Sequence, residues 1–246
     1  MNVCRADLHV HTALSPCADA AMTPLVVVAW AVDEGLDMIA ICDHNSAGNV
    51  AAAQRAAGDA LCVLAGMEVT TAEEAHVVGL FPDAAAALAA AAEVAATLPP
   101  AGPDYAAHFG EQLLMDEDGR EVGREGRALA LASGFTVEEA VALVHRHGGL
   151  AVAAHVDRRG FGVVAQLGVF PHHAGFDAVE VSPHAAPGSD AWATAAAYGL
   201  PVLRGSDAHR PEEIGAARSA LRLAAPTFAE LRLALQAADG REVLDA

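Results

Sequence analysis

The sequence predicts an α/β protein in which parallel strands alternate with covering helices, and two observations point to this fold class. Hydrophobic residues make up 54% of the 246 residues but aromatic residues only 4%, so Ala, Val and Leu must build the core. This composition is typical of parallel strands covered by helices on both faces. Short apolar runs also alternate with helical patterns along the chain, as they do in βαβ units. The length is within the range of one α/β barrel.

The predicted strands are short apolar runs that end at turn residues or at polar residues. We expect them at residues 2–9, 37–42, 61–66, 75–81, 150–154, 177–181 and 201–205. Together with the helices between them, these strands make about seven βα units. The expected organisation is one domain that spans residues 1–246.

The helices between the strands carry explicit start and stop signals. Thr23-Pro24 provides a cap followed by proline at the first helical position, and this helix ends at Gly35. Ser46 is the expected cap of a second helix that closes at Gly58. Two later helices begin at the capping boxes Thr136-x-x-Glu139 and Thr227-x-x-Glu230 and end at residues 147–149 and near Gly240.

Residues 99–130 interrupt this rhythm with prolines, glycines and the acidic run at 116–118. The segment is too short to form a core of its own. We therefore expect an irregular insertion, or a lid-like loop, within the α/β domain.

The formal net charge is −18, and no run of Lys or Arg is present. A nucleic-acid-binding protein normally has a basic face, so a long nucleic acid partner is not expected. A small phosphorylated substrate remains compatible, because bound divalent cations would cancel negative charge locally.

The four cysteines lie in the first quarter of the chain without a CxxC spacing, and three of them are expected to be buried free thiols. No signal peptide is indicated at the N-terminus, and the Ala-rich stretch 84–98 is too short to span a bilayer. These features predict a cytoplasmic protein that does not contact membranes.

Asp7, His9 and His11 share one side of the first predicted strand and its continuation, because side chains alternate along a strand. Two imidazoles on one face can share a cation, and a neighbouring carboxylate can orient one of them. Taken alone, the pair of His9 and His11 is also compatible with a polar strand end that binds no metal.

The same kind of residue recurs at the ends of the other predicted strands. The residues concerned are Asp43 and His44, Glu68, His76, His155, and the pair Asp207 and His209. In parallel α/β barrels the carboxyl ends of the strands gather around one mouth, where active sites form. The convergence of His, Asp and Glu on one place predicts a metal centre.

Three further residues are candidates for contact with substrate. Arg158 and Arg159 follow directly on His155 and are expected to meet a substrate phosphate, with two solvated surface arginines as the alternative. His184 follows the strand that ends at residue 181, close to the predicted mouth.

These residues, in this order, resemble the PHP (polymerase and histidinol phosphatase) family. Its members include histidinol phosphatases, nucleotide and oligonucleotide phosphoesterases, and the PHP domains of bacterial DNA polymerases. The likeness covers nearly the whole chain and is most specific in DLHVHT at 7–12, AICDHNS at 40–46, GMEVT at 66–70 and GSDAH at 205–209. It implies a distorted (β/α)7, TIM-like barrel that holds up to three metal ions.

The resemblance also implies three groups of ligands. The first metal would be held by His9, His11, Glu68 and Asp207, and the second by Glu68, His76 and His155. The third would be held by His44, His209 and a side chain from the loop after His11. Family members often place His or Asp there, but this loop is longer, and Asp19 is the expected ligand with Cys17 as the alternative.

The mixed set of imidazoles and carboxylates suits Mn²⁺, Fe²⁺ or Zn²⁺. With two or three such ions, the chain is expected to be a phosphoesterase in which a metal-bound hydroxide attacks a small phosphomonoester or nucleotide. No protein nucleophile is assigned, because no Ser-His-Asp triad is visible. The alternatives are a nuclease or exonuclease acting on short oligonucleotides and a non-catalytic, metal-stabilised regulatory domain.

Overall fold

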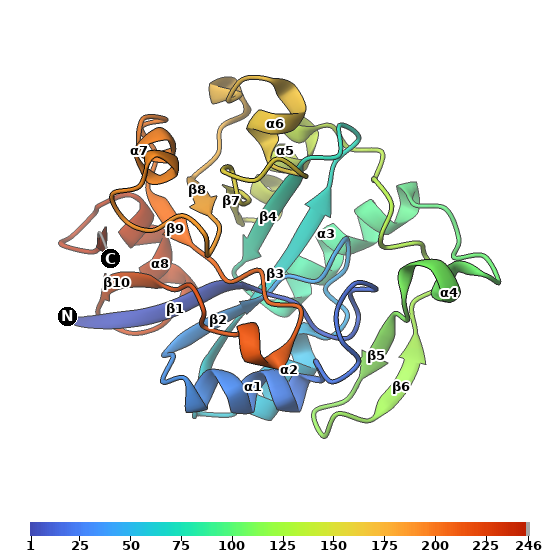
Figure 1. The fold of residues 1–246 in the computed structure, drawn as a ribbon. Helices are drawn as coiled ribbons and strands as arrows, with labels where there is room; N and C mark the ends of the chain where they lie inside the picture. The colour runs from blue at the N-terminus through green and yellow to red at the C-terminus, as the bar shows by residue number, and fades with distance from the viewer. Residues whose placement is uncertain (245–246) are drawn as a thin grey trace.

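The computed structural model describes residues 1–244, and within them a curved sheet of nine strands forms a barrel-like layer surrounded by helices (Figure 1). The strands lie in the order β11-β10-β1-β2-β3-β4-β7-β8-β9. Their bounds are β1 (Asn2–Val10), β2 (Met38–Ile41), β3 (Cys62–Thr70), β4 (His76–Phe81), β7 (Leu150–Ala153), β8 (Ala178–Val181), β9 (Val202–Arg204), β10 (Ser219–Leu223) and β11 (Glu242–Leu244). Each predicted strand is present, and the α/β barrel-like fold class is confirmed.

The expectation of a parallel sheet is wrong for β4, which runs antiparallel to both β3 and β7. No helix separates β3 from β4, because the short turn 71–75 joins them directly. The reversal places the first residue of β4 beside the last residue of β3, so that His76 pairs with Thr70. His76 therefore reaches the mouth from the start of its strand.

Strands β10 and β11 were not predicted, and they extend the sheet beyond β1 by antiparallel pairing. The segment that follows β9 then returns to the end of β1. His11 N donates a hydrogen bond to Ala208 O at 3.0 Å, and Val10 forms a parallel bridge with Ala208. These contacts nearly close the barrel at its mouth and bring Asp207 and His209 beside His11.

The helices cover the sheet from outside (Figure 1). Their bounds are α1 (Pro24–Asp33), α2 (Val50–Ala57), α3 (Ala84–Thr97), α5 (Val137–Arg146), α6 (Val163–Leu167), α7 (Asp190–Ala196) and α8 (Phe228–Leu235), with the 3-10 turns η1 (His172–Ala174) and η2 (Pro211–Glu213). The cap at Thr23 and the capping box of Thr136 and Glu139 are present as predicted. Between residues 1 and 244, no helix is both long and apolar enough to cross a membrane.

Two helix boundaries differ from the prediction. Helix α2 begins at Val50 rather than after Ser46, because the Ser46 hydroxyl accepts a hydrogen bond from Gly48 N in the preceding turn. Helix α8 ends at Leu235, short of Gly240. At its start Thr227 caps the helix, but the Glu230 side chain accepts from Ala224 N instead of closing the capping box.

The insertion at 99–130 is more ordered than expected. It contains α4 (Tyr105–Phe109) and an antiparallel hairpin of β5 (Leu113–Met115) and β6 (Glu121–Arg124), which lies beside the barrel in Figure 1. Leu113 N donates to Ala13 O at 2.9 Å, and the Asn45 amide donates to Leu129 O at 2.9 Å. The insertion is therefore anchored to the loops that follow β1 and β2, next to the mouth.

A bulge in β1 decides which side chains face the inside of the barrel. Asp7 pairs with Ile39 and Val10 with Ile41, so β1 contains one extra residue across this interval. Leu8 belongs to the inner apolar cluster, whereas Val10 belongs to the cluster under the helices. Bulges re-aim side chains in this way, and this one turns His9 and His11 toward the barrel mouth.

Candidate metal centre

The carboxylate of Glu68, near the end of β3, lies at the centre of the buried polar residues at the mouth. Its Oε1 atom lies 3.3 Å from His9 Nε2, 2.7 Å from His76 Nδ1 and 3.3 Å from His155 Nε2. Its Oε2 atom lies 2.9 Å from His44 Nδ1 and 3.5 Å from His11 Nε2. One carboxylate thus faces five imidazoles, and Glu68 itself is fully buried.

Asp207 joins the cluster from the segment after β9. Its Oδ1 atom lies 3.0 Å from His11 Nε2 and 3.5 Å from His9 Nε2. The candidate ligand atoms form three sets, and within each set all the atoms lie within 4.8 Å of one another. These sets are His9, His11, Glu68 and Asp207; His44, Glu68 and His76; and His11, His44 and His209. The family resemblance implied nearly the same groups, except that His44 takes the place of His155 beside Glu68 and His76, and His11 joins His44 and His209.

The spacing of these atoms fits a bound cation. Ligand atoms about 2.1 Å from an ion lie about 3.0–3.4 Å from one another at octahedral or tetrahedral angles. His9 Nε2 and His11 Nε2 are 3.2 Å apart, and His76 Nδ1 and His155 Nε2 are 3.3 Å apart. Within residues 1–244, four buried side-chain nitrogen or oxygen atoms lack a hydrogen bond of good geometry. Two of them, His44 Nδ1 and Glu68 Oε2, face each other at 2.9 Å inside the cluster. The cluster is built from groups that a cation would satisfy.

The outer nitrogens of two imidazoles are held by further buried groups. His9 Nδ1 lies 2.9 Å from Glu180 Oε1, and His11 Nδ1 lies 2.9 Å from Ser15 Oγ. Ser15 Oγ in turn donates to Asp43 Oδ1 at 2.7 Å. Such partners orient a metal-binding imidazole and select its tautomer.

Asp7 has a different role from the one expected. Its two carboxylate oxygens accept hydrogen bonds from Ser206 N at 3.0 Å and Gly215 N at 2.9 Å. Asp7 therefore fixes the chain beyond β9, and Glu180 is the carboxylate that orients His9. Burial raises the pKa of Asp7 to about 6, although its hydrogen bonds with Ser206 and Gly215 oppose the rise.

The electrostatics of the cluster favour cation binding. Burial lowers the pKa of His76 to about 4 and, together with the neighbouring His209, lowers the pKa of His11 well below its usual value. Burial opposes protonation of His9 as well, but Glu180 and Glu68 outweigh it and raise its pKa. Neutral imidazoles bind a metal directly, whereas a proton held by His9 must leave when a cation enters.

Several residues at the mouth have left-handed backbone conformations that non-glycine residues rarely adopt. His155 has φ 28°, Asp207 has φ 52° and Asn45 has φ 51°. Strain of this kind concentrates at functional sites, where the surrounding structure holds it. Here it directs His155 and Asp207 into the cluster from the ends of β7 and β9.

The loop after His11 brings Cys17, rather than the carboxylate of Asp19, to the third group. Asp19 is exposed, and its Oδ1 atom accepts a hydrogen bond from Ala21 N at 2.8 Å. Cys17 lines the cavity beside the cluster together with His209, and its thiol lies near the imidazoles of His44 and His209. Burial opposes ionisation of this thiol, but the two imidazoles outweigh it and lower its pKa to about 6.

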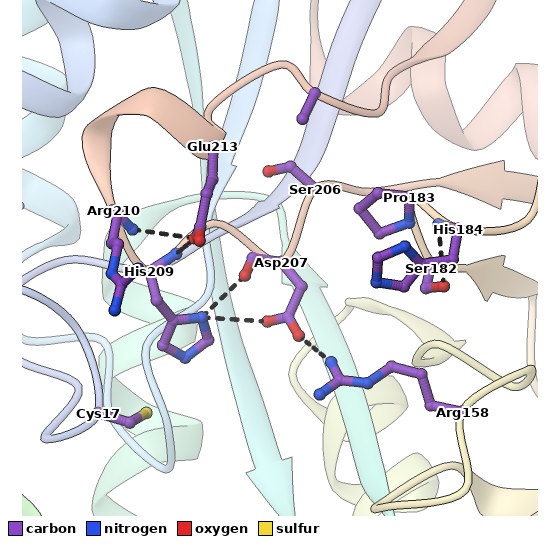
Figure 2. A pocket seen from close by; sticks show the side chains of 11 residues that line it. Cys17, Arg158, Ser182, Pro183, His184, Ser206, Asp207, His209, Arg210 and Glu213 are labelled. Atoms are coloured by element: carbon purple, nitrogen blue, oxygen red, sulfur yellow. Dashed lines mark hydrogen bonds and ion pairs between the residues drawn. The ribbon is translucent and has the colours of Figure 1, made fainter.

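A cavity of about 520 Å³ opens beside the cluster and is lined by Arg158, His184, Arg210 and Cys17 among others (Figure 2). Arg158 forms an ion pair with Asp207, which lies between Arg158 and His209 in Figure 2. Arg159 is exposed and is not among the residues that line this cavity. The structure therefore brings two of the three predicted substrate contacts to the cavity.

Sequence reasoning missed three residues that lie at this site. Glu180 is a charged residue between two valines of a buried strand, and this pattern could have identified it. Arg210 directly follows the Asp207–His209 motif and lines the cavity. Phe161 stacks on the His76 ring with 4.5 Å between centroids and an interplanar angle of 17°, and no local signal announced it.

Comparison with known families gives two matches along the chain. Residues 7–157 match the PHP domain, and residues 189–239 match the family described as PHP-associated. Both stretches contribute strands to the same nine-stranded sheet. The first stretch contains every candidate ligand except Asp207 and His209.

Two curated relatives share 27% identity with the chain. One is the 5'-3' exoribonuclease Rnm of Escherichia coli (strain K12), aligned over 83% of this chain and 85% of that protein. The other is the 5'-3' exoribonuclease of Haemophilus influenzae (strain ATCC 51907 / DSM 11121 / KW20 / Rd), aligned over 61% of this chain and 68% of that protein.

Among solved structures, the lesion-specific endonuclease PfuEndoQ from Pyrococcus furiosus superposes with a TM-score of 0.73 at 18% identity. An Endonuclease Q in complex with a 27-mer duplex substrate containing an abasic lesion gives 0.73 at 17% identity. Both superpositions cover 98% of this chain, which spans 58% of the length of each of those chains. At this identity the likeness shows a common fold.

Proposed function

Because the chain belongs to the PHP domain family of metal-dependent hydrolases, we propose that it is a nuclease that hydrolyses short oligonucleotides. The observation that carries the proposal is the Glu68 carboxylate facing five buried imidazoles, since such a cluster serves phosphate ester hydrolysis. The likeness to two 5'-3' exoribonucleases supports RNA as the substrate and the 5' end as the starting point.

The proposed ligands are the residues whose nitrogen and oxygen atoms converge at the mouth. They are His9, His11, His44, Glu68, His76, His155, Asp207 and His209. Their chemistry fits two or three divalent ions of Mn, Fe or Zn. When bound, such ions activate water at neutral pH and neutralise phosphoryl oxygens.

The protein's own groups bind and orient the substrate in this proposal. Arg158, Arg210 and His184 line the cavity beside the cluster and are assigned to phosphate oxygens. The ion pair with Asp207 holds the Arg158 guanidinium at the edge of the cluster, where the scissile phosphate would lie.

The net charge of −18 led us to expect no long nucleic acid partner, and the comparisons count against that expectation. An acidic protein can still bind an oligonucleotide locally through a few arginines and the bound cations. Because few phosphates would then be neutralised, binding should depend only weakly on salt concentration. Short strands should therefore be the better substrates.

The proposal is tested with purified, metal-replete protein and a short 5'-phosphorylated RNA, a long single-stranded RNA, a DNA of the same sequence and a simple phosphomonoester. We expect release of mononucleotides from the 5' end, fastest for the short RNA, and no release by Glu68→Gln. Hydrolysis of the phosphomonoester alone would favour a phosphatase of small molecules instead. Failure to hydrolyse any phosphodiester with each of the three metals would overturn the proposal.

A further inference from the structure

We infer that Phe161 is the platform on which a nucleobase of the substrate stacks beside the metal centre. The inference rests on the nuclease function proposed above and deepens it, because it names an unpaired nucleobase as the part of the substrate that the protein recognises. Phosphate esters without a base should then be poor substrates.

Phe161 is connected to the cluster through His76. The two rings stack with 4.5 Å between their centroids and an interplanar angle of 17°. His76 is 7% exposed, and its Nδ1 atom lies 2.7 Å from Glu68 Oε1. One ring therefore separates Phe161 from the carboxylate at the centre of the cluster. A group that stacks on Phe161 would lie next to the proposed site of hydrolysis.

The face of the Phe161 ring that points away from His76 is open to solvent. Phe161 is 43% exposed although its other face is against His76. Within residues 1–244, no aromatic ring other than that of His76 stacks on it. Because burial of apolar surface is what stabilises a fold, an aromatic ring left in water contributes little to stability. Its exposed face is available to a planar partner instead.

The loop between β7 and α6 holds this exposed ring in a strained conformation. Phe161 has φ 60°, which a bulky residue rarely adopts. Its carbonyl oxygen accepts a hydrogen bond from His76 N at 2.8 Å. The next residue, Gly162, has no room for a side chain, because a Cβ atom there would lie 2.6 Å from Arg158 O. Strain that the surrounding structure maintains is typical of functional sites.

The same loop supplies a group that is assigned to phosphate. Arg158 pairs with Asp207 at the edge of the cavity (Figure 2). Phe161 is not among the residues that line that cavity, and its ring contacts His76 instead. A nucleotide whose phosphate meets Arg158 can therefore direct its base away from the cavity and onto Phe161.

Stacking on one aromatic ring predicts the kind of nucleic acid that binds. Every base has an aromatic face, so recognition should tolerate any sequence and should favour single strands, whose bases are free to stack on the protein. Stacking also supplies affinity without positive charge. This suits a chain with a net charge of −18, which has few cations to offer to phosphates.

The test uses the full, metal-loaded chain and two short 5'-phosphorylated RNAs, one intact and one with abasic sugars at its 5' end. The wild type should prefer the intact RNA in kcat/KM by about 10-fold, a typical effect of one stacked base. Phe161→Leu keeps an apolar cover on His76 but should lose this preference, and Phe161→Tyr should recover it. The control Trp30→Leu removes a ring of similar exposure from helix α1 and should keep the preference.

Activity lost alike on both RNAs in Phe161→Leu would mean that the ring only covers His76, and it would overturn the inference. A wild type that hydrolyses both RNAs equally well would also overturn it, while the nuclease proposal would stand.

Binding is measured separately through the fluorescence of Phe161→Trp, with the wild type as background for Trp30 and Trp192. The ligands are AMP and ribose 5-phosphate, of which only AMP carries a base. Quenching by AMP alone, in a chain that hydrolyses no RNA, would support the stacking and contradict the proposed function. An equal response to the two ligands would overturn the inference whatever the chain hydrolyses.

Discussion

His9 and Glu180 lie 171 positions apart in the sequence and form a buried pair. His9 Nδ1 is 2.9 Å from Glu180 Oε1. Both side chains are almost completely excluded from solvent. The opposite nitrogen of the same ring, Nε2, lies 3.3 Å from Glu68 Oε1. Glu180 therefore selects the His9 tautomer that directs Nε2 into the cluster.

Removing this orienting carboxylate should weaken both the fold and the site. Glu180→Ala leaves the buried His9 Nδ1–H without an acceptor, at a cost of about 1–3 kcal/mol, and loss of such a partner lowers metal affinity or activity about 10–100-fold. Glu180→Gln should restore part of both, because its amide oxygen still accepts. Thermal melting, metal content and nuclease rate measure these effects.

The matched control is Glu93→Gln, which alters an exposed pair with His147. Exposed pairs contribute at most about 1 kcal/mol, so melting and activity should change little. Equal effects of the two glutamate substitutions would contradict an orienting role for Glu180.

Glu68→Gln should abolish activity, because the substitution removes the charge that faces five imidazoles. A ligand shared by two positions should matter more than an orienting partner, so we expect a loss of at least about 100-fold. Chelation of the wild type should lower its melting temperature, because the cations bind only the folded chain. A chelator that leaves the melting temperature and activity unchanged would contradict the metal centre.

Arg158→Ala should raise the KM for oligonucleotides about 10-fold or more, which corresponds to losing a charge-assisted hydrogen bond to phosphate. Arg159→Ala is the control, since this neighbouring arginine is exposed and lies away from the cavity lining. Steady-state kinetics on the short RNA compare the two. A larger effect at Arg159 would mean that the substrate approaches from another side.

Asp43 should prove essential for the loop after β1. Its carboxylate accepts from Thr12 N, Thr12 Oγ1 and Ser15 Oγ, each at 2.7 Å, in a fully buried position. Asp43→Ala leaves these donors unpaired and should cost about 3 kcal/mol or more, which is about 6–12 °C in melting temperature for a chain of this size. Asp83→Ala, which removes an exposed helix cap, should cost about 1 kcal/mol.

The metal-free protein should show an unusually acidic thiol at Cys17. Its pKa is lowered to about 6, because hydrogen bonds with His209 and His44 outweigh the effect of burial. The thiolate therefore persists as pH falls to about 6, and alkylation of Cys17 should stay fast down to that pH. Burial raises the pKa of Cys62, so that thiol should react slowly throughout. Mass spectrometry of alkylated peptides gives both profiles, and a Cys17 midpoint near 8.5, the ordinary value of a free thiol, would contradict the prediction.

Local patterns in the sequence predicted a large part of the fold. The hydrophobic runs located seven of the nine strands of the main sheet, and the caps at Thr23 and Thr136 located two helix starts. These signals lie within a few residues of the structure that they specify. The direction of β4 was not predicted, because an apolar strand reads alike in either direction and only pairing with β3 and β7 decides it.

The order of residues along the chain was enough to predict which chemical groups gather at the mouth, because strand ends in an α/β barrel converge whatever the loops do. His9, Glu68 and Asp207 could be grouped on that ground. Their hydrogen-bond partners became known from the folded structure. Glu180 reaches His9 across 171 residues, and the course of one loop sets Cys17 rather than Asp19 beside His209. Such contacts depend on packing between distant segments, which no local pattern encodes.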